Sequence, residues 1–243
     1  MINLNKKILL FLMKIAVVMA NINNYEYYRE FPDIHNKDKI DWYYFTDANI
    51  KSNFWKIINT NQIDKLKNIS SRLIVKYIKI NTHLLLPNYD YFFWIDSSFL
   101  ISNVDIVNKL MEFLFNKTEL ILYSHNCRWK EKKLSYEVER CSKLKSINKN
   151  KLQLQWDFYQ NSGFHNKRGF LFSSGIFLRK NKNNINKMFE EWYQHNIDYT
   201  TRDQISLPFI LWKHNIIPTI IIKENININT LVGKKKMKPR KNR

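Results

Sequence analysis

The chain has 243 residues, of which 44% are hydrophobic, enough apolar material for one large domain or two small ones with an ordinary core. Lysine and arginine outnumber aspartate and glutamate by 40 to 21. This excess favours anionic ligands such as nucleic acid, diphosphate-containing donors or acidic membrane surfaces, without choosing among them. The two cysteines, Cys127 and Cys141, lack metal-site spacing, so they exclude a disulfide-rich scaffold and favour a reduced compartment, with at most one disulfide.

Residues 6–20 contain an apolar run for which two interpretations compete. One is a signal peptide or membrane anchor, but Lys14 interrupts the run, which is too short to span about 30 Å of hydrocarbon. The other is a buried parallel strand at residues 15–20, and it fits better. We therefore expect an N-terminal extension over residues 1–12, no transmembrane segment, and a domain that begins at Met13.

The following segments alternate between strand and helix patterns. Residues 41–46 suit a strand, residues 70–86 have helical spacing, and residues 89–95 form an apolar, aromatic strand. This alternation predicts an α/β domain with a mostly parallel sheet, whose ligand sites lie beyond the carboxyl ends of its strands. We further expect helices at residues 104–115, 153–159, 186–195 and 203–214, strands at residues 120–123 and 216–222, and, at residues 169–178, a strand pair or a strand broken at Gly175.

The end of the chain is strongly basic. From Gly233 onward it contains seven lysines and arginines and almost nothing apolar, so we expect residues 13–232 to form the domain and residues 233–243 to form a disordered tail. Such a tail could make peripheral contact with acidic surfaces. No glycine-rich phosphate loop or dinucleotide fingerprint occurs in the sequence, which argues against kinases and dehydrogenases.

Two carboxylates lie where predicted elements begin or end. Asp96 follows the strand at residues 89–95, where it could hold a divalent cation against a diphosphate, because hard cations prefer oxygen ligands. The alternative, a turn aspartate that caps the next helix, is equally open. Asp203 opens a late apolar helix between Arg202 and Gln204, and there the local pattern favours a simple N-cap beside a solvated arginine.

Basic residues on the predicted helix at residues 70–86 are a third candidate. Arg72, Lys76 and Lys79 fall three or four residues apart and share a face, on which Arg72 and Lys76 could contact phosphate. A single basic face on a helix usually lies in water, however. The histidines lack zinc-site spacing among themselves and more often have a structural role.

Three blocks of the sequence then carry a resemblance. They include Trp94-Ile95-Asp96-Ser97, Phe172-Ser173-Ser174-Gly175 and Thr201-Arg202-Asp203-Gln204, with a shorter His and Arg block at residues 125–128. In this order they resemble a glycosyltransferase-like family formerly labelled a domain of unknown function. Its best-known members are plant proteins linked to seed mucilage and turgor control. The blocks cover most of residues 13–213.

More distantly, the layout is similar to glycogenin and the bacterial lipopolysaccharide galactosyltransferases. These enzymes have the GT-A fold, bind a nucleotide sugar with a manganese ion and retain the anomeric configuration. Asp96-Ser97-Ser98 matches the place of their DxD motif. The resemblance therefore implies a metal ion, Mn²⁺ or Mg²⁺, on Asp96. Because Ser98 replaces the second carboxylate and no histidine follows His214, we expect weaker metal binding than in a DxD enzyme.

The resemblance implies a GT-A-like domain that moves a sugar from a nucleoside-diphosphate sugar, such as a UDP-sugar, to a glycan, protein or lipid acceptor, with retention. Asp203 and Gln204 would face the reacting carbon. His125 and Arg128 would lie on the acceptor side. The donor side would comprise Thr46, Asp47, Arg72, Lys76, His83, Asp96, Ser98, Ser174, Gly175 and Arg202.

Two other functions stay open at this point. Ser98 suggests a catalytically silent relative that binds sugar nucleotides without turnover. The net charge suggests a nucleic-acid-binding protein, whose affinity would fall steeply with salt. The lack of an anchor pattern favours the cytoplasm of a microbe or of an infected host cell.

Overall fold

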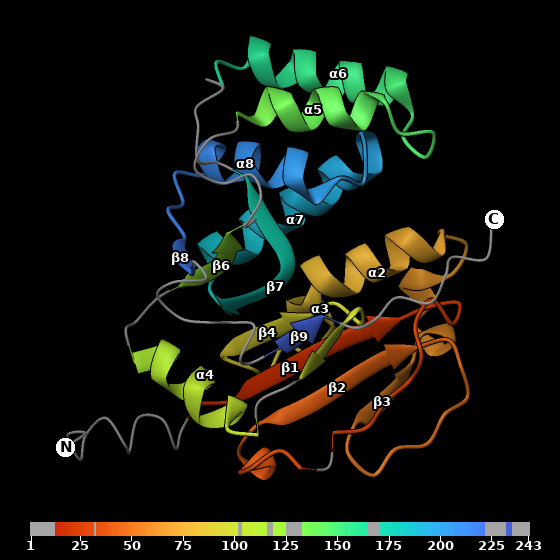
Figure 1. Ribbon diagram of the computed structural model, residues 1–243, viewed down its shortest axis with the longest axis vertical. Helices are drawn as coiled ribbons and strands as arrows, with labels where there is room; N and C mark the ends of the chain where they lie inside the picture. Colours follow the sequence, from red (N-terminus) through yellow and green to blue (C-terminus); the bar gives the residue numbers. More distant parts are fainter. Residues whose placement is uncertain are drawn as a thin grey trace.

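A computed structural model describes residues 13–31, 33–101, 104–115, 119–124, 133–164, 171–221 and 232–234. Within these residues a seven-stranded sheet runs through the centre and helices cover both of its faces (Figure 1). No helix in this part of the chain is long and apolar enough to cross a bilayer. The expected extension over residues 1–12 lies outside the described residues.

The sheet has the strand order β3-β2-β1-β4-β7-β6-β8. The strands from β3 to β4 are parallel to one another, and so are β6 and β8, whereas β7 runs antiparallel to both β4 and β6. The expected α/β class with a mostly parallel sheet is therefore confirmed. The strands are β1 (Ile15–Asn21), β2 (Asp41–Thr46), β3 (Lys56–Asn59), β4 (Tyr91–Ile95), β6 (Leu120–Ser124), β7 (Phe172–Lys180) and β8 (Thr219–Ile221).

Strand β1 is the segment for which a membrane anchor was the alternative, and the strand interpretation is confirmed. All of its residues are buried, and it pairs with β2 on one side and β4 on the other. Ile15 and Val17 enter the apolar cluster on one face of the sheet, while Ala16 and Val18 enter the cluster on the other. A strand that is covered on both faces needs such a continuous apolar run.

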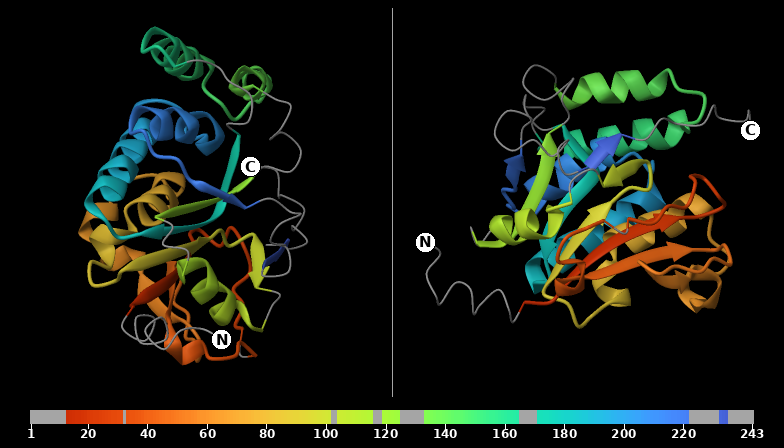
Figure 2. Two further views of the ribbon diagram at one scale, coloured as in Figure 1. Left: turned by 90° about the vertical axis from the view of Figure 1, so that its left-hand side faces the viewer. Right: turned by 60° about the horizontal axis from the view of Figure 1, so that its bottom comes forward.

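The helices form two layers on the sheet and one more beyond them. α4 packs on one face, α2, α7 and α8 pack on the other, and α5 and α6 lie outside α8, away from the sheet (Figure 2). The helices are α2 (Ser71–Ile80), α3 (Thr82–Leu85), α4 (Ile106–Phe115), α5 (Leu134–Ser142), α6 (Lys149–Asn161), α7 (Asn183–Asp198) and α8 (Asp203–Lys213).

Two predicted elements differ from the observed ones. The helix expected at residues 70–86 is split at Asn81 into α2 and α3, and the hydroxyl of Ser70 caps its start by accepting from the main-chain N–H of Leu73. The strand expected to break at Gly175 is one continuous strand, β7. The glycine is needed there because a side chain would collide with neighbouring residues, not because the strand ends.

Several short elements were not predicted, because they are too short to show a hydrophobic period. They are β3, the pair formed by β5 (Phe99–Ile101) and β9 (Val232–Lys234), and 3-10 helices at Lys37–Lys39, Thr60–Gln62 and Asp64–Leu66. β9 pairs antiparallel with β5 and includes the first two residues of the predicted basic tail. Residues 235–243 lie outside the described residues.

An aromatic stack joins the outer helices to α8. The rings of Tyr159 on α6 and Phe209 on α8 lie 3.9 Å apart, nearly parallel, and both side chains are fully buried. The hydroxyl of Tyr159 lies 2.9 Å from Nδ1 of His195 on α7 and accepts from Gln155 Nε2 at 2.7 Å. Three helices therefore share one contact, which fixes α8 relative to the rest of the fold.

We expect Phe209→Ala to lower the free energy of unfolding by about 3–5 kcal/mol, because it leaves a cavity beneath the Tyr159 ring. Urea denaturation measures this change. Phe209→Leu, which keeps most of the volume, should cost less, and Leu154→Ala on the exposed face of α6 should cost almost nothing. Equal losses for Phe209→Ala and Leu154→Ala would contradict the assignment.

Candidate active site

The carboxyl ends of β1, β2, β3 and β4 lie along one edge of the sheet. Thr46 at the end of β2 pairs with Asn21 of β1 and Asn59 of β3, and Asp96 directly follows β4. Polar residues from four successive parallel strands therefore meet at the edge where α/β domains bind ligands. Thr46 and Asp96, both expected on the donor side, therefore lie at one edge of the sheet.

Asp47 shapes the loop at this edge. Its carboxylate accepts the main-chain N–H of Asn23 at 2.9 and 3.0 Å, and its main-chain carbonyl accepts from Asn61 Nδ2 at 3.2 Å. The hydroxyl of Thr46 is turned to the main-chain N–H of Ala48 at 3.1 Å. Thr46 and Asp47, both expected on the donor side, thus hold the loops after β1 and β2 in place.

Asp96 begins a tight turn after β4. Its main-chain N–H donates to the carbonyl of Gly175 on β7 at 2.8 Å, and its carbonyl accepts the N–H of Phe99 at 2.9 Å. The indole of Trp94 donates to Asp96 Oδ1 at 2.6 Å, which orients the carboxylate. The alternative of a helix-capping aspartate is wrong, because the element that follows is β5. Ser98 lies within the turn.

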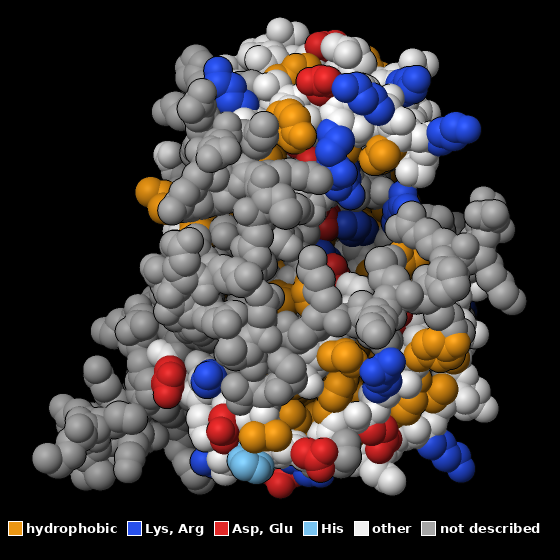
Figure 3. Space-filling model, in the orientation of Figure 1, with side chains coloured by type: hydrophobic (Ala, Val, Ile, Leu, Met, Phe, Trp, Pro, Cys, Tyr) orange, Lys and Arg blue, Asp and Glu red, His pale blue; other side chains and the backbone are white. Residues whose placement is uncertain are grey.

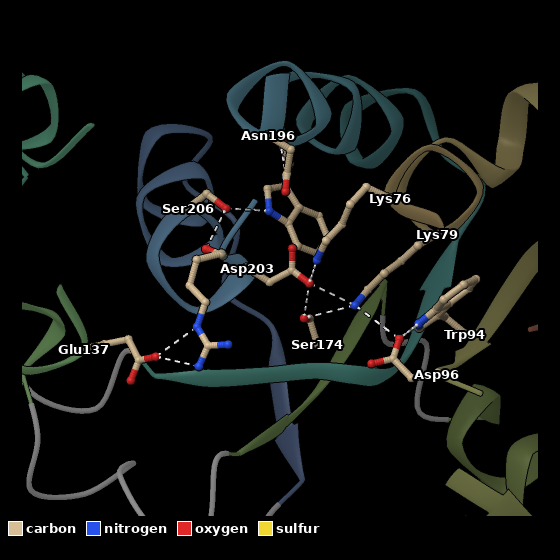
Figure 4. A network of polar contacts seen from close by, with 11 residues as sticks. Lys76, Lys79, Trp94, Asp96, Glu137, Ser174, Asn196, Asp203 and Ser206 are labelled. Carbon is tan, nitrogen blue, oxygen red and sulfur yellow. Dashed lines mark hydrogen bonds and ion pairs between the residues drawn. The ribbon is translucent and has the colours of Figure 1, made fainter. Parts of the chain in front are cut away.

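Asp203, Lys76, Lys79 and Ser174 form a buried polar cluster beside Asp96 (Figure 4). Oδ2 of Asp203 accepts from Lys79 Nζ at 3.0 Å, from the hydroxyl of Ser174 at 2.7 Å and from Lys76 Nζ. Lys79 Nζ also donates to Ser174 Oγ at 3.1 Å and lies 3.5 Å from Asp96 Oδ1. The cluster joins α2, β4, β7 and α8.

Charge pairing decides how these groups titrate. Burial alone would raise the pKa of Asp203, but the charges of Lys76 and Lys79, with the hydrogen bonds from Lys76 and Ser174, outweigh it and hold that pKa well below its ordinary value. Burial alone would lower the pKa of Lys79, yet Asp203 and Asp96 raise it. For Lys76 burial prevails and lowers the pKa. Asp203 is therefore an ionised carboxylate and Lys79 a permanent ammonium at neutral pH.

The N-cap interpretation of Asp203 is also wrong. α8 begins at Asp203 with Arg202 in the N-cap position, and no side-chain cap bond is formed. The carboxylate is instead turned to the lysines of α2. Its second oxygen, Oδ1, is buried and has no hydrogen-bond partner among the described residues.

Glu137 on α5 is fully buried, and two arginines compensate its charge. Arg202 donates to Glu137 Oε1 through Nε at 3.1 Å and Nη2 at 2.9 Å. Arg140 donates through Nη2 to Oε1 at 3.0 Å and through Nε to Oε2 at 3.2 Å. The alternative of a freely solvated Arg202 is therefore wrong, and α5 is tied to the first turn of α8.

His83 lies away from this cluster. Its Nε2 is 2.8 Å from Glu190 Oε1, and its Nδ1 is 3.1 Å from Nη2 of the buried Arg179. Arg179 pairs with Phe92, four residues before Asp96, so this group lies roughly 13 Å down the strand. Burial, and next the charge of Arg179, lower the pKa of His83 despite Glu190. His83 thus supports the packing of α3 against α7.

Four predicted site residues lie outside the buried cluster or outside the described part of the chain. Arg72 is exposed on the first turn of α2, and Gln204 is half-buried and makes no side-chain hydrogen bond among the described residues. His125 and Arg128 lie outside the described residues. Charged side chains of both signs gather in a hollow near the middle of the face shown in Figure 3.

Two residues of the buried charged groups, Lys79 and Glu137, were not singled out by the sequence patterns. Lys79 follows Lys76 by three residues, so one turn of helix aims both ammonium groups at Asp203. That spacing was visible, but a basic helix face normally lies in water. Glu137 lies in a highly charged segment whose pattern gave no sign of burial.

Fold and site together define the class: a GT-A-like, Rossmann-like α/β domain whose charged cluster lies at the carboxyl edge of its sheet. The chain matches the family described as TOD1/MUCI70, glycosyltransferase-like domain, over residues 25–236. Because this match spans most of the chain, the chain belongs to that family, which confirms the resemblance seen in the sequence blocks. A search of curated proteins found no match.

The side chains around Asp96 do not suit the divalent cation that the distant resemblance implies. No group of three or more His, Cys, Asp or Glu side chains that could hold a metal occurs among the described residues. Asp96 Oδ1 already accepts from Trp94 and faces Lys79, while Asp203 Oδ2 already has three donors. Hard cations need several oxygen lone pairs that converge on one point.

Gly175 tests how tightly Asp96 is held. A Cβ at this position would lie 2.8 Å from Cε2 of Phe99 and 3.1 Å from Oδ2 of Asp96. We expect Gly175→Ala to cost about 1–3 kcal/mol of folding free energy and to displace the Asp96 carboxylate. Thermal denaturation and donor binding measure the two effects. At Gly163 a Cβ would meet nothing within 4 Å, but the φ of +82° strains an alanine. Gly163→Ala should therefore lower stability while sparing donor binding, and equal binding losses for the two variants would contradict the prediction.

Asp203→Asn tests the charge pairing through pH. At neutral pH we expect this variant to lower the free energy of unfolding by about 3–5 kcal/mol, because the ammonium groups of Lys76 and Lys79 lose their carboxylate partner. The folded-state pKa of Asp203 lies below the ordinary value of about 3.9, so its stabilisation is complete above that value and is lost as the pH falls. The difference in the free energy of unfolding between wild type and Asp203→Asn should therefore become smaller at acidic pH.

Urea denaturation of both proteins at neutral and acidic pH measures this difference. Asp64→Asn, which changes an exposed aspartate in a surface ion pair, is the matched control and should change stability little at either pH. A gap between wild type and Asp203→Asn that stays constant with pH would show that the Asp203 charge is not paired in the folded state.

Proposed function

We propose that the chain is a glycosyltransferase that uses a nucleoside-diphosphate sugar, such as a UDP-sugar, and transfers the sugar to a glycan, protein or lipid acceptor. The observation that carries this proposal is the cluster of Asp96, Lys79, Ser174 and Asp203 at the carboxyl edge of the sheet. Ligands of open α/β sheets bind at this edge. Membership of a glycosyltransferase-like family supports the proposal.

The chemistry of Asp203 favours a retaining transfer. An inverting enzyme needs a general base on the acceptor hydroxyl, with a pKa near the working pH. Asp203 has a lowered pKa, and its Oδ2 is occupied by two ammonium groups and a hydroxyl, so it is a poor base. Its neighbour Gln204 is half-buried at the start of α8 and offers an uncharged carbonyl oxygen.

In the proposed reaction the bond between the anomeric carbon and the diphosphate oxygen breaks, and the acceptor oxygen forms the new bond on the same face. The acceptor proton leaves with the diphosphate. The Gln204 carbonyl would stabilise positive charge at the anomeric carbon. Asp203 would act through position, by holding Lys79 and the first turn of α8.

We assign residues to the donor diphosphate by the solvent exposure of their side chains. Arg72 on α2 is exposed, and the side chain of Arg202 is partly so, which leaves both able to reach the diphosphate. Lys76 was expected to contact the diphosphate directly, but its ammonium is paired with Asp203. We therefore assign Lys76 to holding the cluster. His125 and Arg128 stay predictions for the acceptor side.

A panel of nucleotide sugars, read for released nucleoside diphosphate, tests the proposed function. We expect one donor to be consumed, and Asp96→Asn to lower kcat/KM at least about tenfold, or 1.4 kcal/mol, because the variant loses a charge at the strand end. Asp64→Asn is again the control. Donor binding without turnover would favour the silent relative, and salt-sensitive binding of nucleic acid alone would favour the second rival.

Proton NMR of the product from an α-linked donor tests the stereochemistry. We expect an α-linked product. We also expect Gln204→Ala to lower kcat with little change in donor affinity, because Gln204 would act only in the transition state. Gln194→Ala, on an exposed side chain of α7, is the matched control. A β-linked product would refute retention. It would also require a general base other than Asp203, whose carboxylate is paired with Lys76 and Lys79.

A further inference from the structure

Lys79 occupies an unusual position for a lysine. Its side chain is 3% exposed, and its ammonium faces two carboxylates from different elements, Asp203 Oδ2 at 3.0 Å and Asp96 Oδ1 at 3.5 Å. Ser174 Oγ is a third oxygen at 3.1 Å. A buried ammonium that joins two carboxylates and a hydroxyl has the oxygen surroundings that a bound cation would otherwise have.

The charges of this group are balanced without any added ion. Lys76 and Lys79 carry two positive charges, and Asp96 and Asp203 carry two negative ones. A divalent cation between the two carboxylates would bring two more positive charges within reach of Lys79, at a buried place where like charges repel strongly.

The sequence offers no substitute set of ligands. Ser98 stands two residues after Asp96, and a neutral hydroxyl is a weak ligand for a hard divalent cation. After His214 the chain contains no histidine and only one acidic residue, Glu224. The oxygen atoms of Asp96 and Asp203 that lie near Lys79 are Oδ1 and Oδ2 respectively, and both already have nitrogen donors.

We propose that the ammonium of Lys79 takes the place of a divalent cation in this site. It joins the carboxylate that ends β4 to the carboxylate that begins α8, and donor binding and transfer proceed without a metal ion. The expectation of transfer without a metal ion rests on the proposed function. The expectation that the site binds no divalent cation does not depend on it.

Binding of Mn²⁺, followed by electron paramagnetic resonance, tests the proposal without any turnover. We expect the wild-type protein to bind no stoichiometric Mn²⁺. Ser98→Asp alone should add little, because Lys79 still occupies the position. Ser98→Asp combined with Lys79→Gln should create a site that binds at least about tenfold more tightly than either single variant. Lys56→Gln, which breaks an exposed ion pair, is the control for loss of a lysine.

Turnover, where a donor is found, gives the second measurement. We expect EDTA to leave the wild-type rate unchanged and Lys79→Gln to lower it. One-to-one Mn²⁺ binding that Asp96→Asn abolishes would overturn the proposal, as would a rate that EDTA removes and Mn²⁺ restores. If no donor is turned over, the proposed function fails and the Mn²⁺ titrations still decide this inference. If Lys79→Gln does not fold, the wild-type and Ser98→Asp titrations decide it.

Discussion

Asp203 is a carboxylate buried between two ammonium groups, and the arrangement of α2, β7 and α8 depends on that pairing. A buried charge without a partner costs several kcal/mol, so Lys79 and Asp203 can be buried only together. Each lies on a different helix, and Ser174 on β7 completes the contact. The ion pairs thus fix the two helices in one position relative to the strand between them.

The direction of β7 makes this possible. Because β7 runs antiparallel to β4, its first residues lie at the edge where β4 ends, and Gly175 accepts the main-chain N–H of Asp96 there. A parallel strand would bring its carboxyl end to this edge, and Ser174 would have no place beside Asp203. The lack of a side chain at Gly175 then allows the Asp96 carboxylate and the Phe99 ring to approach the strand closely.

The sequence predicts the buried strands of the central sheet better than it predicts the polar cluster. β1 and β4 are continuous apolar runs, and such runs have few interpretations other than a covered strand. The ordered blocks around Asp96, Gly175 and Asp203 identify the family. By contrast, the burial of Lys79 depends on Asp203, which lies more than a hundred residues away, and no local pattern reveals such a pairing.

The same reason explains two of the local interpretations that were wrong. An aspartate at the start of a helix is usually a cap, and an arginine before it is usually solvated, yet Asp203 and Arg202 have buried partners on α2 and α5. His83 illustrates the converse. The family resemblance placed it on the donor side, whereas its neighbours Arg179 and Glu190 give it a role in packing.

Charge balance within the cluster also restricts how the chain can change over evolutionary time. Replacing any one of Lys76, Lys79 or Asp203 leaves the cluster with one unbalanced charge, so a protein that carries a single substitution should be less stable. Acceptable changes would then come as matched pairs, one on α2 and one on α8. Divergent relatives should therefore keep all the charged residues of the cluster or replace residues on both helices together. Relatives that have lost only one of these charges should be rare.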